Sequence, residues 1–300
     1  MTDIRFGFWP KQLTLSAGAI RIEPLPEYQQ VVKLLNDDAR AAGDWLHPPL
    51  TPAYVPGTPH DQRPEVYAPR YSLSPTHLMT LPDSDGRECG ELLLAVLGMV
   101  EGLRLIPEDW GHFYRTAIRA HKLCDLICSR SDLVHVLENT HTFWQAHPTP
   151  EIRRGIFGAI HWLLFSQSYE HQFEEFGAQY TVLDACYHVH CLVHGAPSPR
   201  VKHARRASFL AAQYSIPEPA WAAMRPDNAC DLSEIRNAFV HEGRYGSEPI
   251  GFGHPTSHPN IVLELKAFNT RTILGILGID CGYVRSPVDT RQMHGLDVGK

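Results

Sequence analysis

Apolar residues recur at three- and four-residue steps through most of the chain after residue 86, which is the spacing of helices that bury one face. Four segments run for fifteen residues or more, too long for ordinary strands: 91–105, 109–128, 131–146 and 150–170. Further helical segments follow at 173–187, 201–215, 233–242 and 261–279. The pattern therefore predicts a mainly α chain.

The first 85 residues have a different pattern. Short runs rich in β-branched or aromatic residues, at 4–9, 12–15 and 19–25, are separated by turn formers and predict two or three strands. The next run, 28–46, has apolar residues at helical spacing and predicts a helix. We therefore expect a smaller mixed α/β module at the N-terminus.

Proline is concentrated at the end of this module, because nine of the 24 prolines fall between Pro48 and Pro82. Proline lacks a backbone donor and restricts its predecessor, so this stretch is expected to be neither regular helix nor central strand. Its aromatic and aliphatic residues suggest an extended segment that lies over a surface. We expect a mixed module over 1–85, a helical domain over 86–284 and a polar, peripheral tail over 285–300.

The composition, 43% hydrophobic and 20% charged, excludes intrinsic disorder and allows one large core or two small ones. A formal net charge of −6 argues against a polyanion binder with a wholly basic surface, but leaves room for a local cationic cleft. No apolar run is long enough to predict a membrane helix, and the first residues do not resemble a signal peptide. We expect a cytoplasmic chain whose seven cysteines are reduced.

The segment most informative about function is DLSEIRNAFVHEGRY, residues 231–245. Asp231, followed three residues later by Glu234, has the character of a capping box, and Gly243 is placed to end the helix in a left-handed cap. The segment therefore predicts a short, well-delimited helix. Its polar members of interest are Arg236, Asn237 and His241.

This segment resembles the motif of the HEPN superfamily (higher eukaryotes and prokaryotes nucleotide-binding), an arginine, a polar residue, three residues and a histidine. Here it reads Arg236-Asn237-Ala238-Phe239-Val240-His241. The Apea-like branch is similar in a second respect, a long aromatic-rich helix with an acidic residue, here Asp184, about fifty residues before the motif. The resemblance covers roughly residues 150–280 and implies a HEPN-like helical bundle. Nothing in residues 1–85 matches a module that we can name.

Many members of the family resembled are metal-independent RNA endonucleases. Cleavage without metal requires the 2′-hydroxyl to lose a proton while it attacks the adjacent phosphorus, and the departing 5′-oxygen to gain one. Histidine titrates near neutral pH, so His241 can do either. Arg236 would stabilise the charge that grows on the phosphoryl oxygens, and Asn237 would orient His241 or a phosphate. The expected products carry a 2′,3′-cyclic phosphate and a 5′-hydroxyl.

One chain carries a single motif, whereas active members of the family resembled pair two HEPN domains around a shared cleft. The resemblance therefore implies a homodimer with a composite site at its interface. A role in antiviral defence, as a toxin or in stress response would suit the family. The alternative is a non-catalytic HEPN protein that binds RNA, a nucleotide or a protein partner.

A basic stretch beside the motif could hold RNA, because no acidic residue occurs from 195 to 215. Phosphate contacts are the expected role of its cations. A solvated helix face is the equally plausible alternative. The candidate RNA-binding residues are Arg200, Lys202, Arg205 and Arg206, with His203 among them.

Histidines and cysteines could instead bind zinc, but the knuckle spacing Cys-x2-Cys is absent. We expect no metal or other cofactor, and interpret these residues as buried thiols and polar imidazoles. The chain also lacks a Gly-x-Ser-x-Gly elbow, a phosphate-binding P-loop and a dinucleotide-binding glycine turn. The zinc candidates are His121, Cys124 and Cys128, then Cys186, His188, His190, Cys191 and His194, and the loop histidines His254 and His258.

Overall fold

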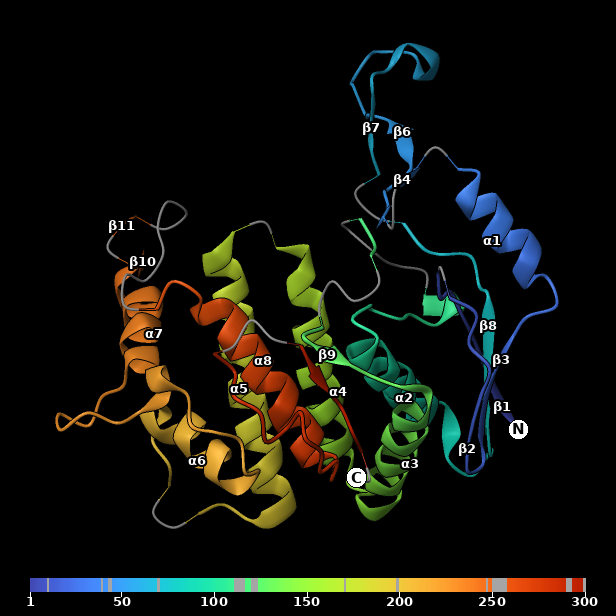
Figure 1. The fold of residues 1–300 in the computed structure, drawn as a ribbon. Coiled ribbons are helices and arrows are strands. Elements are labelled where there is room, and N and C mark those ends of the chain that lie inside the picture. The colour runs from blue at the N-terminus through green and yellow to red at the C-terminus, as the bar shows by residue number, and fades with distance from the viewer. Residues whose placement is uncertain are drawn as a thin grey trace.

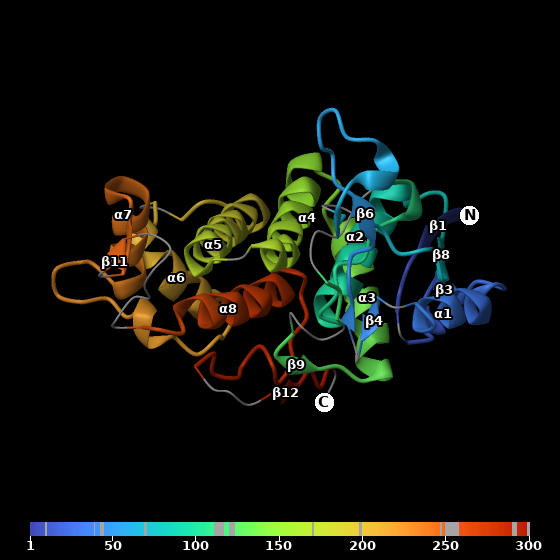
Figure 2. The ribbon, with the colours of Figure 1, turned by 90° about the horizontal axis from the view of Figure 1, so that it is seen from above.

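The computed structural model describes residues 1–9, 11–38, 40–42, 45–68, 71–110, 117–119, 124–169, 171–197, 200–246, 248–249, 258–289 and 293–298. Its elements follow one another in a row, with α7 and α6 at one end, then α5 and α4, then α2 and α3, and a small sheet with α1 at the other end (Figures 1 and 2). Helices, with their 3-10 turns, take up 49% of the described residues and strands 14%, which confirms a mainly α chain.

The apolar periodicity places most helices correctly. Pro150 is the first residue of α4, where its missing N–H costs no hydrogen bond. Among the described residues no helix combines the length and the apolar character that crossing a bilayer would need. The helices are α1 (Tyr28–Asn36), α2 (Gly86–Val100), α3 (Arg130–Ala146), α4 (Pro150–Phe165), α5 (Gln172–His194), α6 (Arg206–Gln213), α7 (Asp231–Glu242) and α8 (Ile261–Ile276). The 3-10 turns are His60–Gln62, Glu108–Trp110, Ser166–Ser168, His203–Arg205 and Ala220–Ala222.

The long helix expected over 109–128 is wrong in its described part. Ile118 forms an antiparallel bridge with Leu46, and β9 (Leu126–Ile127) pairs in parallel with β12 (His294–Gly295). Residues 111–116 and 120–123 of that segment, which include His121, lie outside the described residues. The helix expected over 28–46 is also too long, since α1 ends at Asn36 and the hairpin of β4 (Ala41–Ala42) and β5 (Trp45–Leu46) follows.

The N-terminal module contains a four-stranded antiparallel sheet in the order β1-β8-β3-β2. Met79 of β8 pairs with Ile4 on one side and with Ile22 on the other, and all three are buried. The expectation that 48–82 holds no central strand is wrong, because the proline-free run between Pro75 and Pro82 forms β8. The strands are β1 (Thr2–Phe6), β2 (Leu15–Ala17), β3 (Ile20–Pro24) and β8 (His77–Leu81).

The rest of the proline-rich stretch does not lie flat over a surface. β6 (Leu50–Pro52) and β7 (Glu65–Tyr67) form a hairpin that projects away from the sheet (Figure 1). Tyr54 and Tyr67 are 81% and 63% exposed there, whereas Tyr71 is buried and its hydroxyl donates to the carbonyl of Leu46. Proline is compatible with a two-stranded hairpin because the outer edge of each strand pairs with no further strand, so a missing backbone N–H there costs no hydrogen bond.

The sheet and the helices share one continuous core across residue 85. A Cβ at Gly90 of α2 would lie 2.3 Å from the Cδ1 of Ile4 and 3.1 Å from Leu81, so glycine is what allows α2 to approach the sheet. The terminal segment also joins the core, which makes the expected peripheral tail wrong. Arg271 of α8, 1% exposed, donates to the carbonyls of Ser286 and Pro287, and Leu296 is fully buried.

His77 is the fully buried histidine of the sheet core. Its Nε2 accepts a hydrogen bond from the backbone N–H of Leu13 at 3.0 Å, and its Nδ1 lies 2.8 Å from the hydroxyl of Thr76. Acceptance at Nε2 requires the neutral ring, and burial lowers the pKa of His77 to about 4. The rings of Phe6, Phe8 and Tyr28 surround it.

We expect the free energy of unfolding to fall between pH 6.5 and pH 4, because only the unfolded chain protonates His77 in that range. The loss should reach about 3 kcal/mol and then level off. Urea titrations at pH 7, 5.5 and 4.5 would measure it. A His77→Gln variant, which cannot titrate, should lose this part of the pH dependence, and an unchanged pH dependence in that variant would contradict the assignment.

Candidate functional site

The start of α7 is fixed by polar contacts around Cys230. The backbone N–H of Cys230 donates to the hydroxyl of Ser233 at 3.1 Å, so the capping box expected from Asp231 and Glu234 is wrong. Those two carboxylates bind Arg225 instead, Asp231 at 2.7 Å. The first turn of α7 is thus tied to the loop before it.

The end and the packing face of α7 are fixed by glycines. Gly243 follows the helix in the left-handed region at φ 64°, which confirms the predicted cap. On the buried side, a Cβ at Gly177 of α5 would lie only 3.1 Å from the ring of Phe239. The absence of a side chain at Gly177 therefore lets α7 lie close to α5.

The structure brings the three motif residues together. Nη1 of Arg236 lies 2.9 Å from Nε2 of His241 and donates to Oδ1 of Asn237 at 3.1 Å. Because a guanidinium can only donate, Nε2 of His241 accepts, and the imidazole carries its proton on Nδ1. Arg236 is half-buried, whereas Asn237 and His241 are exposed. A ligand can therefore reach the histidine and the outer edge of the guanidinium.

The ring of Tyr180 of α5 lies against the guanidinium of Arg236. The guanidinium carbon of Arg236 lies 5.9 Å from the ring centroid, and its Nε is buried without a hydrogen-bond partner among the described residues. Burial raises the pKa of Tyr180 to about 12, with Asp184 acting in the same direction and Arg236 and Arg206 opposing. Tyr180 was not among the expected site residues, although it lies four residues before Asp184 on the same helix face.

Asp184 does not contact the motif directly. Its carboxylate accepts from Nη1 of Arg206 at 2.5 Å and lies 3.6 Å from Nδ1 of His203. Arg206 is only 7% exposed and stacks over the ring of Tyr187, 4.7 Å from its centroid. Arg206 is therefore buried and paired within the chain, and its expected role as a phosphate ligand stays a prediction.

The other basic candidates are exposed but do not form one face. The helix expected from residue 201 begins at Arg206, after a 3-10 turn, so Arg200, Lys202 and Arg205 precede the α-helix. Arg205 donates to Oδ1 of Asn228 at 2.9 Å. Lys202 precedes the turn at an exposed position, and Arg200 lines a pocket.

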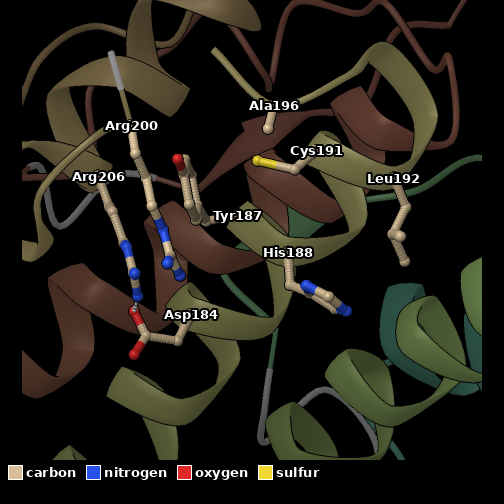
Figure 3. Close-up of a pocket in the computed structure, with 8 residues that line it drawn as sticks. All are labelled: Asp184, Tyr187, His188, Cys191, Leu192, Ala196, Arg200 and Arg206. Carbon is tan, nitrogen blue, oxygen red and sulfur yellow. Dashed lines mark hydrogen bonds and ion pairs between the residues drawn. The ribbon is translucent and has the colours of Figure 1, made fainter. Parts of the chain in front are cut away.

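That pocket, of about 530 Å³, opens beside Asp184. Figure 3 shows Arg200 and Arg206 running side by side toward Asp184, with Cys191 and Ala196 across the cavity. The wall is built by one face of α5 and by the loop that leads to α6. The lining residues are Asp184, Tyr187, His188, Cys191, Leu192, Ala196, Arg200 and Arg206.

No group of three or more histidine, cysteine or acidic side chains with a metal-binding arrangement occurs among the described residues. Cys124 donates to the carbonyls of Val100 and Leu126, and Cys186 is fully buried. His258 binds Asp231 at 2.6 Å. The zinc candidates His121 and His254 lie outside the described residues.

Replacing Asp184 with alanine should lower the free energy of unfolding, because it leaves the buried Arg206 cation unpaired. The loss should be roughly 2 kcal/mol, below that of a fully enclosed pair, since Asp184 is 32% exposed. Asp280→Ala is the matched control, because its pair with Arg285 is exposed on both sides and should contribute less than about 0.5 kcal/mol. Urea denaturation of both variants would measure the difference, and equal losses would contradict the assigned role of the Asp184 pair.

Comparison of the chain with models of protein families, with curated proteins and with solved structures found no match. The resemblance to the HEPN superfamily therefore rests on the motif over 236–241 and on the helix that carries Asp184. The chemistry that the site can perform depends above all on the contact between Arg236 and His241.

Proposed function

We propose that the chain is a metal-independent RNA endonuclease whose reacting groups are Arg236 and His241. The observation that carries this proposal is the 2.9 Å approach of the guanidinium to Nε2 of an exposed, neutral imidazole. A fixed cation and a proton acceptor therefore lie close enough to contact the same phosphate group. When a neighbouring hydroxyl attacks a phosphodiester, a base must accept its proton and a cation must stabilise the charge on the phosphoryl oxygens. The imidazole and the guanidinium can fill these two roles.

The chemistry follows from these contacts. A phosphodiester that binds Arg236 takes over the N–H that now points at His241, and frees the lone pair of Nε2. His241 then accepts the proton of the 2′-hydroxyl while the bond from the 2′-oxygen to phosphorus forms and the bond from phosphorus to the 5′-oxygen breaks. Arg236 holds the phosphoryl oxygens as their charge grows, and Asn237 keeps the guanidinium aligned through its Oδ1.

The departing 5′-oxygen needs a proton from a second group. We propose that His241 of a second copy of the chain, in its protonated imidazolium form, supplies it and becomes neutral, so that the active form is a homodimer with two motifs at its interface. Val240, the neighbour of His241, is 52% exposed and would lie in such an interface. The cytoplasmic location and the role in defence or stress response remain parts of this proposal.

One observation favours a second function, a non-catalytic HEPN protein that binds RNA, a nucleotide or a protein partner. The contact with Arg236 occupies the lone pair that a general base must use. If the ligand phosphate binds elsewhere on the guanidinium, His241 stays capped and the site binds without cutting. Cleavage distinguishes the two functions.

His241→Ala should reduce cleavage of single-stranded RNA in excess EDTA by at least about 100-fold, the usual contribution of a general base. Arg236→Ala should reduce it similarly through loss of charge stabilisation. His135→Ala is the control, since this exposed histidine of α3 is outside the site and should leave the rate unchanged. Single-turnover rates on a labelled RNA would measure the effect. Absence of cleavage by the folded, dimeric protein would favour the second function.

The proposed homodimer predicts twice the mass of the chain in size-exclusion chromatography with light scattering. Val240→Asp should give a folded monomer, because it places a charge in an apolar contact beside the site. Leu34→Asp is the control, since Leu34 is 64% exposed on α1, at the other end of the molecule (Figure 1). A strictly monomeric wild-type protein, with and without RNA, would count against the composite site.

A further inference from the structure

The pocket beside Asp184 is lined by two guanidinium groups and a single carboxylate. Arg200 forms no ion pair with a described residue, and the single carboxylate of Asp184 faces both Arg206 and His203. Arg206 keeps a buried Nε without a hydrogen-bond partner in the described part of the chain. One carboxylate therefore neutralises only part of the charge of the two guanidinium groups, so that the pocket attracts anions.

The same cluster reaches the motif. Burial lowers the pKa of His203, and Arg206, Arg236 and Arg200 lower it further against the opposing effect of Asp184. The arginines of the pocket and Arg236 of the motif therefore all disfavour the charged form of the same imidazole. Tyr180 under Arg236 and Tyr187 under Arg206 belong to the same helix, seven residues or about 10 Å apart along its axis.

The far wall of the pocket is largely apolar, with His188 as its polar member. Leu192, Ala196 and the sulfur of Cys191 line it opposite the two arginines (Figure 3). A volume of about 530 Å³ falls in the range of sites for small organic ligands. The two walls together match a nucleotide, with its phosphate at Arg200 and its base against Leu192 and Ala196.

We propose that this pocket binds one nucleotide of a single RNA strand, one or two positions from the phosphodiester held at Arg236. The choice of an RNA strand as the ligand rests on the proposed RNA-cleaving function. The distance of about 10 Å between the two tyrosines along α5 is a length that a dinucleotide spans. Arg200 is then the ligand of the phosphate, and Arg206 and Asp184 are the positioning residues that hold the wall of the pocket. The pocket would thereby set which part of the strand lies at His241.

Cys191 gives a direct readout that does not depend on cleavage. It is a free, partly exposed thiol in the pocket wall, whereas Cys186 on the same helix is fully buried and serves as an internal control. The measurement is the rate at which iodoacetamide alkylates Cys191, followed by peptide mass spectrometry. The probes are adenosine 5′-monophosphate, uridine 5′-monophosphate, adenosine, and a tetranucleotide of 2′-deoxyribose that the proposed reaction cannot cut.

The tetranucleotide and the monophosphates should slow the alkylation of Cys191, and adenosine without phosphate should not. Arg200→Ala should weaken the protection by about tenfold in concentration, the loss of one charge-assisted hydrogen bond. Arg154→Ala, an exposed arginine of α4 away from the pocket, should leave it unchanged. Equal alkylation with and without the probes, equal protection by adenosine, or full protection in Arg200→Ala would overturn the proposal. Protection by monophosphates but not by the tetranucleotide would overturn the assignment to a strand.

The cleavage assay separates this proposal from the function on which it rests. Arg200→Ala should raise the KM for RNA about tenfold and leave kcat within twofold, because the pocket holds the strand and does not touch the reacting atoms. A loss confined to kcat would overturn the assignment of Arg200 to binding. If the wild-type protein cuts no RNA, the proposed function fails, and the protection of Cys191 still decides whether the pocket binds nucleotides.

Discussion

The ion pair between Asp184 and Arg206 is the contact on which the arrangement of the site depends. Arg206 begins α6 in a buried position, where a cation is stable only if a carboxylate and a polarisable surface replace water. Asp184 supplies the carboxylate, and the ring of Tyr187 supplies the polarisable surface. The pair therefore holds α6 and the turn before it against the middle of α5, which is where the pocket opens.

Aromatic side chains connect this part of α5 to the motif on α7. Tyr180, four residues before Asp184, lies under Arg236, and Phe239 packs against the bare backbone of Gly177. The position of α7 on α5 thus decides where Arg236 and His241 point. Without a ligand the two side chains bind each other, and in the proposed mechanism a phosphate separates them. We regard this exchange of partners as the step that couples phosphate binding to the availability of the base.

Helical periodicity predicts α2 to α5 and α7 to α8 because each helix buries a continuous stripe of apolar side chains. All residues of such a stripe come from one short run of the sequence. The motif helix and its cap at Gly243 are local in the same sense. The strand β8 escaped prediction because its five residues and Thr76 are all that separate Pro75 from Pro82. In the tail, burial depends on Arg271, fifteen residues before Ser286, which no local pattern reveals.

The candidate site divides in the same way. The residue types over 236–241 identify it, since they occur within two helical turns. The roles of the basic stretch could not be predicted, because Arg206 pairs with an acid 22 residues away while Arg200 lines the pocket. Sequence alone treats these two cations as equivalent. Burial makes one a structural ion and leaves the other available to a ligand.

The central claim, attack by a 2′-hydroxyl with His241 as the base, is tested most directly by changing one oxygen of the substrate. A cleavage site is first mapped in an RNA of defined sequence in excess EDTA, and the single ribose before the cut is then replaced by 2′-deoxyribose. The account predicts that cleavage at that position stops while binding persists, and that the unmodified RNA yields a 2′,3′-cyclic phosphate. Cleavage of the substituted RNA at the original rate would contradict it.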